Sequence, residues 1–499
     1  MILKELLEVL NKPNVSGGLE RQVKDITYDS REVKKDSLFV AIHGFKTDGR
    51  KYIADAIRKG ASVIVTEGAI ETPEKDITVI SVPDARNALA LLSAQFYGYP
   101  SRRLRMIGIT GTNGKTTTSY LIKAIIEKAG KRCGLLGTIS YIIGDETIQS
   151  PHTTPESADL QKYLHRIIES GAEYAVMEVS SHALELNRVA DCEFDIAVFT
   201  NLTQDHLDFH KTMEGYFSAK LKLFTSLSNE RGKMVKKVGI INIDDPYSKR
   251  ILDAIKVKAV TYGFSRDADI RPDDVRMDIN GIAFKAVTQK GIFPIESKLT
   301  GKYNINNILS TIGVGQALGF DNSIIADGIR AVENISGRFE KIEEGQDFAV
   351  VVDYAHTEDA LKRLLEAVKE FANGRIITVF GCGGDRDKGK RPKMGETAGK
   401  ASNIVIITSD NPRSEDPMEI IKEIEEGIKG IKNGNKPDYL IMPDRREAIC
   451  KAVELARKDD IVVIAGKGHE DYQIIGDKKS HFDDREIARE AIKTVVSNK

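Results

Sequence analysis

The feature that most constrains the fold is a short apolar run, rich in Val and Ile, that recurs along the chain. Each run ends in Gly, Ser, Asp or Asn and precedes a segment with helical periodicity. The runs are LRMIGIT, YAVMEVSS, IAVFTNL, VGIINIDD, RIITVFGCGGD, NIVIITSDNPR and DIVVIAGKGHE. Strands buried on both faces of a parallel sheet have this continuous apolar character. The sequence therefore predicts an α/β protein whose polar motifs lie at the carboxyl ends of parallel strands, where such sheets bind ligands.

Length and two breaks in the pattern predict three domains. A chain of 499 residues is too long for a single hydrophobic core, and residues 97–105 and 333–346 have the character of linkers. Within the middle part, residues 266–300 alternate polar and apolar positions and predict a small antiparallel insertion. The predicted domains are a small N-terminal α/β domain (1–98), a central parallel-sheet domain (99–335) and a C-terminal Rossmann-like domain (336–499).

Composition narrows the compartment and the partners. Lysine plus arginine number 73 against 74 aspartate plus glutamate, so no global basic field favours nucleic acid or an anionic membrane. The N-terminus lacks the pattern of a signal peptide, and no apolar run approaches the roughly 20 residues that span a bilayer. The scattered cysteines Cys133, Cys192, Cys382 and Cys450 predict a reducing compartment. We therefore expect a cytoplasmic protein whose partners are small molecules.

The segment MIGITGTNGKTTTSYLIKAIIEKAG has the order strand, Gly-rich loop and amphipathic helix, which is typical of a phosphate-binding loop. Backbone N–H groups would face the anion, Lys115 would add a charge, and the Thr116 hydroxyl could bind Mg²⁺. The general GxxxxGK[ST] pattern needs Gly at position 109, where this chain has Ile. A Gly-rich turn with an ordinary lysine is the alternative. The expected ATP contacts are Gly111, Thr112, Asn113, Gly114, Lys115, Thr116 and Thr117, so the central domain is predicted to be a P-loop ATPase domain.

Two further motifs follow predicted strands of the same sheet. Glu178 ends one apolar run and His206 lies shortly after another. Alone, Glu178 could be a strand-end cap and His206 a helix-start residue; together with the loop, they predict a metal site that neutralises phosphate charge.

The motifs occur in one order along nearly the whole chain, and this collinear set is far more specific than any single motif. In order they are DSR, GTNGKTT, HTTP, EVSSH, TNLTQDHLD, a helix containing AK, GKYNINN, GRFE, DYAHT, GCGGDRDKGKRPKMG, DNPR and GKGHEDYQ. The set resembles the Mur ligase family. The resemblance implies ATP-dependent addition of a diamino acid to the D-Glu γ-carboxylate of UDP-N-acetylmuramoyl-L-Ala-D-Glu through an acyl phosphate. Folylpolyglutamate synthetases share the loop but would not explain DSR, or DNPR with GKGHE; a nucleotide-binding protein without catalysis is a further alternative.

The resemblance also implies roles for residues that composition would not single out. Lys220 would be carbamylated and would help to hold a second Mg²⁺; the implied metal ligands are Thr116, Glu178, His206 and carbamylated Lys220, and the implied catalytic residues are Lys115, Lys220, His206 and Glu178. Asn304 and Asn307 would approach the adenine, with an Asn-rich helix start as the alternative. The N-terminal domain would bind the UDP moiety through Ser30 and residues 45–47. The muramoyl dipeptide would then contact Thr153, Thr154, Ser180 and Arg188, whereas Leu186 stands where some relatives have Gln.

The C-terminal motifs are expected to determine the specificity for the amino-acid substrate. Arg413 follows a strand, and its planar guanidinium can bind a carboxylate bidentately, which meso-2,6-diaminopimelate offers and L-lysine lacks. The same ligase using L-lysine is the alternative. The expected amino-acid contacts are Arg386, Asp410, Asn411, Pro412, Arg413, Gly466 and Glu470. Asp353 and His356 are expected to approach the nucleotide after closure about a hinge at 333–346, in a protein that acts as a monomer.

Overall fold

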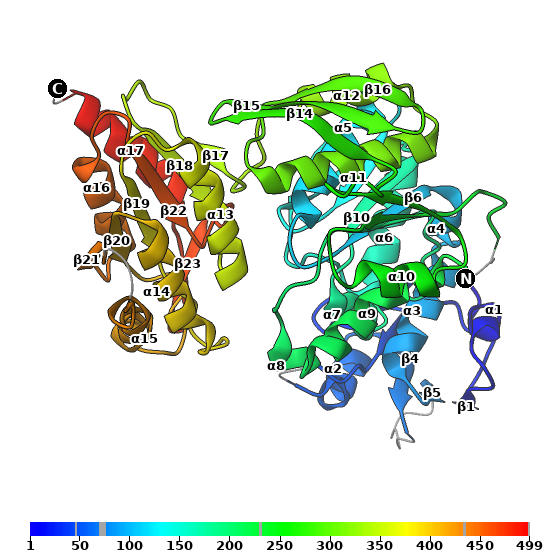
Figure 1. The fold of residues 1–499 in the computed structure, drawn as a ribbon. Coiled ribbons are helices and arrows are strands. Elements are labelled where there is room, and N and C mark those ends of the chain that lie inside the picture. The colour runs from blue at the N-terminus through cyan, green and yellow to red at the C-terminus, as the bar shows by residue number, and fades with distance from the viewer. Residues whose placement is uncertain (45–46, 69–75, 229–231, 433–435, 498–499) are drawn as a thin grey trace.

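A computed structural model describes residues 1–44, 47–68, 76–228, 232–432 and 436–497 (Figure 1). Each predicted region has its own sheet. The C-terminal region, yellow to red in Figure 1, stands beside the central region, and the blue N-terminal region lies at the end of the central region away from the insertion β14–β16. The predicted α/β class is confirmed.

The N-terminal sheet has the strand order β1-β5-β4-β3-β2, in which only the β1–β5 pair is antiparallel among the described pairings. Its apolar residues pack against α3, whose N-cap Asp84 accepts a hydrogen bond from the Asn87 N–H. The elements are α1 (Leu3–Leu6), β1 (Asn14–Ser16), β2 (Asp25–Thr27), β3 (Ser37–Val40), α2 (Ile53–Arg58), β4 (Ala61–Glu67), β5 (Thr78–Val82) and α3 (Ala85–Phe96).

The central sheet has the order β13-β12-β11-β6-β10-β7-β8-β9, parallel from β13 to β7. Its strands are β6 (Arg105–Thr110), β7 (Cys133–Leu136), β8 (Ser140–Ile143), β9 (Glu146–Gln149), β10 (Tyr174–Glu178), β11 (Ile196–Phe199), β12 (Val238–Asn242) and β13 (Lys258–Tyr262). The strand β6 lies between β10 and β11, with Ile109 opposite Glu178 and Thr110 opposite Phe199. This register brings the loops that follow the three strands to one edge of the sheet.

Separate apolar clusters cover the two faces of the central sheet. On one face α5 and α11 pack against the strands, and α6 and α9 contribute apolar residues to the cluster on the other. The helices of this region are α4 (Pro100–Arg103), α5 (Lys115–Lys128), α6 (Ser157–Glu169), α7 (Ser181–Glu185), α8 (Leu207–His210), α9 (Met213–Ser226), α10 (Ser248–Ala254), α11 (Lys302–Leu318) and α12 (Asn322–Arg330). The predicted antiparallel insertion is confirmed, and consists of β14 (Arg271–Asp278), β15 (Gly281–Thr288) and β16 (Gly291–Ser297).

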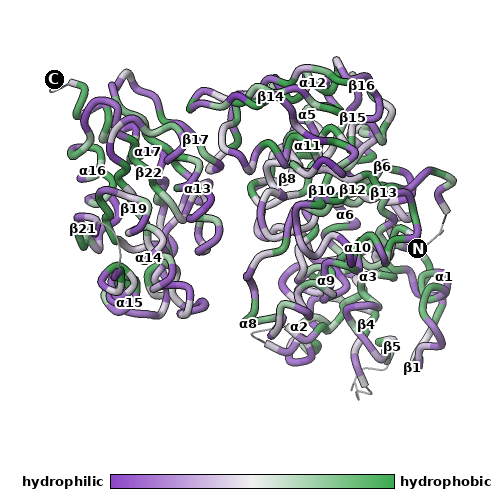
Figure 2. The backbone as a smooth tube through the Cα atoms, in the orientation of Figure 1, coloured by the Kyte–Doolittle hydropathy of each residue, from purple (hydrophilic) through white to green (hydrophobic). Residues whose placement is uncertain are grey.

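The C-terminal sheet has the order β17-β18-β22-β19-β20-β21, parallel from β18 to β21. Figure 2 shows apolar residues along strands such as β22, consistent with burial on both faces. The elements are β17 (Glu340–Lys341), β18 (Ala349–Asp353), α13 (Glu358–Phe371), β19 (Ile376–Phe380), α14 (Lys390–Ala401), β20 (Ile404–Ile407), α15 (Pro417–Lys429), β21 (Asp438–Ile441), α16 (Arg445–Leu455), β22 (Ile461–Ala465), β23 (Tyr472–Ile475), β24 (Lys478–His481) and α17 (Asp484–Ser497).

The boundaries expected at 98/99 and 335/336 fall between α3 and α4 and between α12 and β17. We propose them as the domain boundaries. Among the described residues, the structure contains no helix with the length and apolar character that a bilayer crossing requires.

Candidate active site

The loop between β6 and α5 is held by glycines that no other residue could replace without displacement. Gly114 precedes α5 with φ of 85°, a left-handed conformation that favours glycine. A Cβ at Gly114 would lie 2.4 Å from Asn307 Oδ1, and one at Gly111 would lie 1.8 Å from Thr200 Oγ1. The loop is therefore packed directly against the segment after β11 and against α11.

Two lysines from distant parts of the chain share one carbonyl oxygen. Lys115 Nζ lies 2.9 Å and Lys220 Nζ 2.8 Å from the Gly111 oxygen, and Lys115 also donates to the Thr112 oxygen at 2.7 Å. Burial lowers the pKa of both amines, and the charge of Lys115 lowers the pKa of Lys220 further, to well below its ordinary value. The burial of two amines beside one carbonyl oxygen thus favours a neutral amine at Lys220.

Glu178 and Thr116 form an oxygen-rich pair on the other side of the loop. The Thr116 hydroxyl donates to Glu178 Oε2 at 3.0 Å, and Thr138 donates to the same carboxylate through its N–H at 2.8 Å and its hydroxyl at 2.9 Å. Glu178 is fully buried. Hydroxyl and carboxylate oxygens suit Mg²⁺, which usually takes one or two protein ligands and completes its shell with phosphates and water.

His206 lies at the rim of this group, and its surroundings favour the neutral imidazole. Burial lowers its pKa to about 4, although Asp205, with Oδ2 3.4 Å from His206 Nε2, opposes the shift. Among the described residues, no three His, Cys, Asp or Glu side chains are arranged to hold a metal by themselves. Thr116 and Glu178 therefore fit a Mg²⁺ that also requires ligands from substrate.

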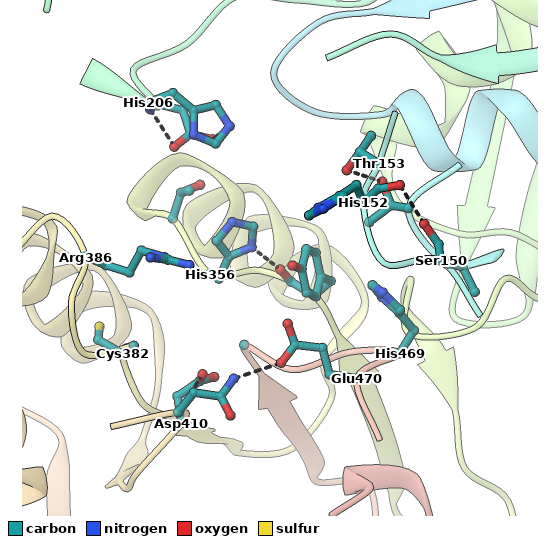
Figure 3. Close-up of a pocket in the computed structure, with 18 of the residues that line it drawn as sticks. Ser150, His152, Thr153, His206, His356, Cys382, Arg386, Asp410, His469 and Glu470 are labelled. Atoms are coloured by element: carbon teal, nitrogen blue, oxygen red, sulfur yellow. Dashed lines mark hydrogen bonds and ion pairs between the residues drawn. The ribbon is translucent and has the colours of Figure 1, made fainter. Parts of the chain in front are cut away.

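Two adjoining cavities lie near the loop and share several lining residues. The smaller has a volume of about 540 Å³, and all of the candidate loop residues from Thr112 to Thr117 line it. The larger, about 1490 Å³, runs between the central and C-terminal regions. Thr153, His206 and His356 line both cavities, and Figure 3 shows all three around the open space, with Arg386 and Glu470 beyond them. Asp353 also lines the smaller cavity.

The two expected adenine residues differ in their surroundings. Asn307 lines the smaller cavity, whereas Asn304 is not among its described lining residues. The Asn304 amide is already used at the start of α11, since it donates to the oxygen of Thr300, which precedes the helix, at 2.7 Å and accepts from Asn307 Nδ2 at 2.8 Å. Asn306, which the sequence did not single out, lines the cavity beside Asn307.

Of the expected dipeptide contacts, Thr153 lines both cavities, and the others make internal contacts. The Thr154 hydroxyl donates to the Glu178 backbone oxygen at 2.8 Å, and Ser180 caps α7 by accepting from the Ala183 N–H. Arg188 donates to the Thr154 oxygen at 3.0 Å and has its Nε 3.3 Å from Glu156. Ser30 is buried in the N-terminal region and accepts from Lys59 Nζ at 2.9 Å through its backbone oxygen; of the adjoining stretch 45–47, Phe45 and Lys46 lie outside the described residues.

The expected amino-acid contacts come together at one end of the larger cavity. The lining residues among them are Arg386, Asp410, Asn411, Arg413, Gly466 and Glu470, whereas Pro412 is not among the described lining residues. Arg413 has φ of 52° and donates to the Gly384 oxygen at 2.7 Å, which aims the guanidinium along the cavity wall. The thiol of Cys382 also lines the wall, and burial raises its pKa to about 12, so it is a protonated, unreactive group.

Sequence reasoning missed two contacts between the C-terminal region and the loop. Arg338 donates to Thr116 Oγ1 at 3.2 Å, and Asp359 accepts from Asn113 Nδ2 at 3.0 Å and from Thr203 Oγ1 at 3.2 Å. The GRFE motif that contains Arg338 was visible in the sequence, but nothing local indicated which region it would contact. Asp359 lies in the first turn of α13, where an acidic residue ordinarily needs no further explanation.

Family models match three successive stretches of the chain. They are the Mur ligase family catalytic domain over residues 22–97, the Mur ligase middle domain over 109–315 and the Mur ligase glutamate ligase domain over 337–468.

Full-length relatives show the same similarity. The UDP-N-acetylmuramoyl-L-alanyl-D-glutamate--2,6-diaminopimelate ligase of Caldanaerobacter subterraneus subsp. tengcongensis is 48% identical over 493 residues, which cover 99% of each chain. The enzyme of the same name from Syntrophomonas wolfei is 46% identical and covers 99% of this chain and 100% of its own. A solved structure of a protein with this name has 34% identity and a TM-score of 0.68, covering 99% and 100% of the two chains. A folylpolyglutamate synthase structure from Mycobacterium tuberculosis, at 17% identity, TM-score 0.61 and coverage of 76% and 91%, shares the fold.

Proposed function

The chain belongs to the Mur ligase family of ATP-dependent amide-forming enzymes, and from this premise we propose its substrates and the roles of its residues. It joins meso-2,6-diaminopimelate to the D-Glu γ-carboxylate of UDP-N-acetylmuramoyl-L-Ala-D-Glu and forms the UDP-MurNAc-tripeptide of peptidoglycan. The relatives named for this reaction match over the full length of the chain, and they favour diaminopimelate over the alternative, L-lysine. The observation that carries the proposal is the continuity of the phosphate-loop cavity with a cavity lined by both Arg413 and Glu470.

The first step activates the γ-carboxylate, which is otherwise a poor electrophile. Its oxygen attacks the γ-phosphorus of ATP and releases ADP, which leaves an acyl phosphate. Lys115 and the loop N–H groups stabilise the charge on the moving phosphoryl group, because the buried ammonium already lies at the loop. Thr116 and Glu178 would hold Mg²⁺, which neutralises phosphate charge when bound.

Lys220 is proposed to act as a carbamate. Its buried amine, with a pKa well below the ordinary value, has the neutral form that reacts with CO₂. Carbamylation would replace the neutral amine beside Lys115 with an anion and remove the competition for the Gly111 oxygen. With His206 at the rim, the carbamate would supply the metal ligand that the described residues otherwise lack.

The second step forms the amide. The amine of diaminopimelate attacks the acyl carbonyl, the tetrahedral intermediate collapses, and inorganic phosphate leaves. Arg413 and Arg386 are proposed to bind a carboxylate of the amino acid and Glu470 an ammonium group, with Asp410, Asn411, Pro412 and Gly466 shaping the pocket. A hinge at 333–346 would close the C-terminal domain over the acyl phosphate and exclude water.

The remaining contacts are proposed for the nucleotide and the dipeptide. Asn307, with Asp353 and His356 from the closing side, would approach the nucleotide, and Asn304 would act through Asn307, to which its amide is bonded. Thr153 would contact the muramoyl dipeptide directly, and Thr154, Ser180 and Arg188 would shape its subsite; Ser30 would bind near the uridine. The enzyme is proposed to act as a monomer, and its ATP and UDP-linked substrates support action in the cytoplasm.

Mass spectrometry of the product tests the proposal. Protein, Mg-ATP and UDP-N-acetylmuramoyl-L-Ala-D-Glu would be incubated with meso-diaminopimelate or L-lysine in parallel while phosphate release is followed. A tripeptide adduct with diaminopimelate, with one phosphate released per adduct, is expected. An adduct with lysine alone would overturn the specificity, and no adduct with either would overturn the reaction.

A further inference from the structure

A buried lysine lies behind the proposed amino-acid pocket and is not used in the mechanism above. Lys467 follows β22 in the loop that carries Glu470, and its side chain is fully buried. Its ammonium group donates to Asn411 Oδ1 at 3.1 Å and to the Tyr472 oxygen at 2.6 Å. Asn411 and Glu470 line the cavity, whereas Lys467 is not among the described lining residues. Lys467 can therefore influence a bound substrate only through its neighbours.

Those neighbours connect the two loops of the pocket. Asn411 Nδ2 donates to Glu470 Oε2 at 2.9 Å, while its Oδ1 accepts from Lys467 and from the Ile474 N–H at 3.0 Å. Lys467 Nζ also lies 3.5 Å from Glu470 Oε2. The orientation of the Asn411 amide is fixed by this pattern, because its oxygen faces two donors and its nitrogen faces the carboxylate. Figure 3 shows the resulting bond to Glu470 beside Asp410, with the carboxylate at the cavity.

The charges around Glu470 favour one ammonium ligand. Asp410 and Glu470 are two neighbouring acids, and Lys467 is the cation that contacts Glu470. Arg445 is fully buried and pairs with the fully buried Asp484 at 2.7 Å, so this pair contributes no net charge.

Burial and the charge of Asp410 raise the pKa of Glu470, and Lys467 opposes that shift. Burial also disfavours ionisation of Asp410, but Lys467 and Arg445 keep its pKa below the ordinary value. Among Asp410, Glu470, Lys467 and the Arg445–Asp484 pair, the acids outnumber the bases by one, and Arg413 and Arg386 add positive charge elsewhere along the same cavity. Tyr354 and Tyr472 also interact with Glu470.

We propose that Lys467 is a positioning residue for the amine-bearing substrate: its buried ammonium group ties the Asp410–Asn411 loop to the Glu470 loop and fixes the Glu470 carboxylate as the acceptor for the substrate's ammonium group. This inference rests on the proposed function, since it assigns Glu470 the ammonium. Without Lys467, Glu470 would face Asp410 with less compensation and would bind a proton at higher pH. A protonated Glu470 would no longer attract the cation.

The test is the Lys467→Met variant, with Lys479→Met as the matched control. Lys479 also lies over the Tyr472 ring, with Nζ 3.9 Å from its centroid, but it belongs to the exposed strand β24. Lys467→Met should raise KM for diaminopimelate by about tenfold or more, the usual effect of losing a hydrogen bond to a charged group, and leave KM for ATP and the UDP-dipeptide within about twofold. The acidic limb of kcat/KM for diaminopimelate should move to higher pH. Lys479→Met should change neither.

Two further variants keep the outcome decisive. Lys467→Arg retains the charge and should return the acidic limb toward its wild-type position. Lys467→Gln retains a hydrogen-bond donor without the charge. It replaces the Met variant in the measurements of KM and of the acidic limb if the Met variant does not fold. An unchanged KM and acidic limb, or an equal loss of affinity for all three substrates, would overturn the positioning role. Absence of the tripeptide with the wild-type protein would instead overturn the proposed function, so the two failures are distinguishable.

Discussion

The phosphate-loop site and the amino-acid site differ in the arrangement of their buried charged side chains. At the loop, two lysine amines contact the same Gly111 oxygen, and burial lowers the pKa of each. At the amino-acid site, Lys467 contacts Glu470 and interacts with the charge of Asp410, and Arg445 forms a buried ion pair with Asp484. The first site presents Lys115 and the loop N–H groups to phosphate, whereas the second presents Arg413 and Arg386 to a carboxylate and Glu470 to an ammonium group. The difference indicates that each half of the reaction has its own electrostatic environment within one continuous cleft.

The largest effect should follow from removing the loop cation. Lys115→Met should lower kcat by about 10³-fold, because a preorganised group that stabilises transition-state charge contributes on this order. Lys128→Met, on the exposed end of α5, is the control and should leave kcat unchanged. Steady-state ADP release measures both. A loss of less than tenfold in Lys115→Met would contradict the assignment of the phosphate site.

The proposed carbamate predicts the next effect. Lys220→Met should lower kcat by about 10²-fold, as for loss of one electrostatic contributor, and the wild-type protein stripped of CO₂ should regain activity when bicarbonate is added. Lys222→Met, which removes an exposed ion pair with Glu185, is the control from the same helix. Wild-type activity that is independent of bicarbonate would rule out the carbamate.

The next prediction concerns the selection of diaminopimelate over L-lysine by Arg413 at the amino-acid site. Arg413→Lys should lower kcat/KM for diaminopimelate by about 10²-fold, because an ammonium cannot reproduce a bidentate contact to carboxylate. The value for L-lysine should change much less, so the preference between the two amino acids should narrow. Competition assays would measure the preference for diaminopimelate over L-lysine. The Arg446→Lys variant, at an exposed position, is the control. Equal losses for both amino acids would show that Arg413 does not read the extra carboxylate.

The smallest effect concerns two histidines near the same site. Burial lowers the pKa of His469 to about 3, whereas the hydrogen bond to Glu486 raises the pKa of exposed His481 above 6.5. His469 should therefore stay neutral as pH falls from 8 to 5, while His481 becomes protonated over that range. Imidazole NMR titration would show a shift for His481 alone. Titration of both near pH 6.5 would mean that the pocket around His469 is open to water.

Local patterns in the sequence predicted the sheets and the phosphate loop well. Apolar runs that end in glycine or a small polar residue have a direct physical meaning, so β6, the loop and α5 follow from neighbouring residues. The shared Gly111 oxygen could not be predicted, because Lys220 is 109 positions away along the chain. The hydrogen bonds of the Asn304 amide and the contact of Arg188 with Glu156 could not be predicted either. Each depends on packing between separate segments.

The separation of the two sites is tested most directly by positional isotope exchange in ATP labelled with ¹⁸O at the β,γ-bridge. With UDP-N-acetylmuramoyl-L-Ala-D-Glu and no amino acid, the wild-type protein should scramble the label through reversible acyl-phosphate formation. The Arg413→Lys and Lys467→Met variants should scramble it at a similar rate, and Lys115→Met should not. Scrambling that is lost in the Arg413 and Lys467 variants, or that requires diaminopimelate, would contradict two electrostatically independent half-sites.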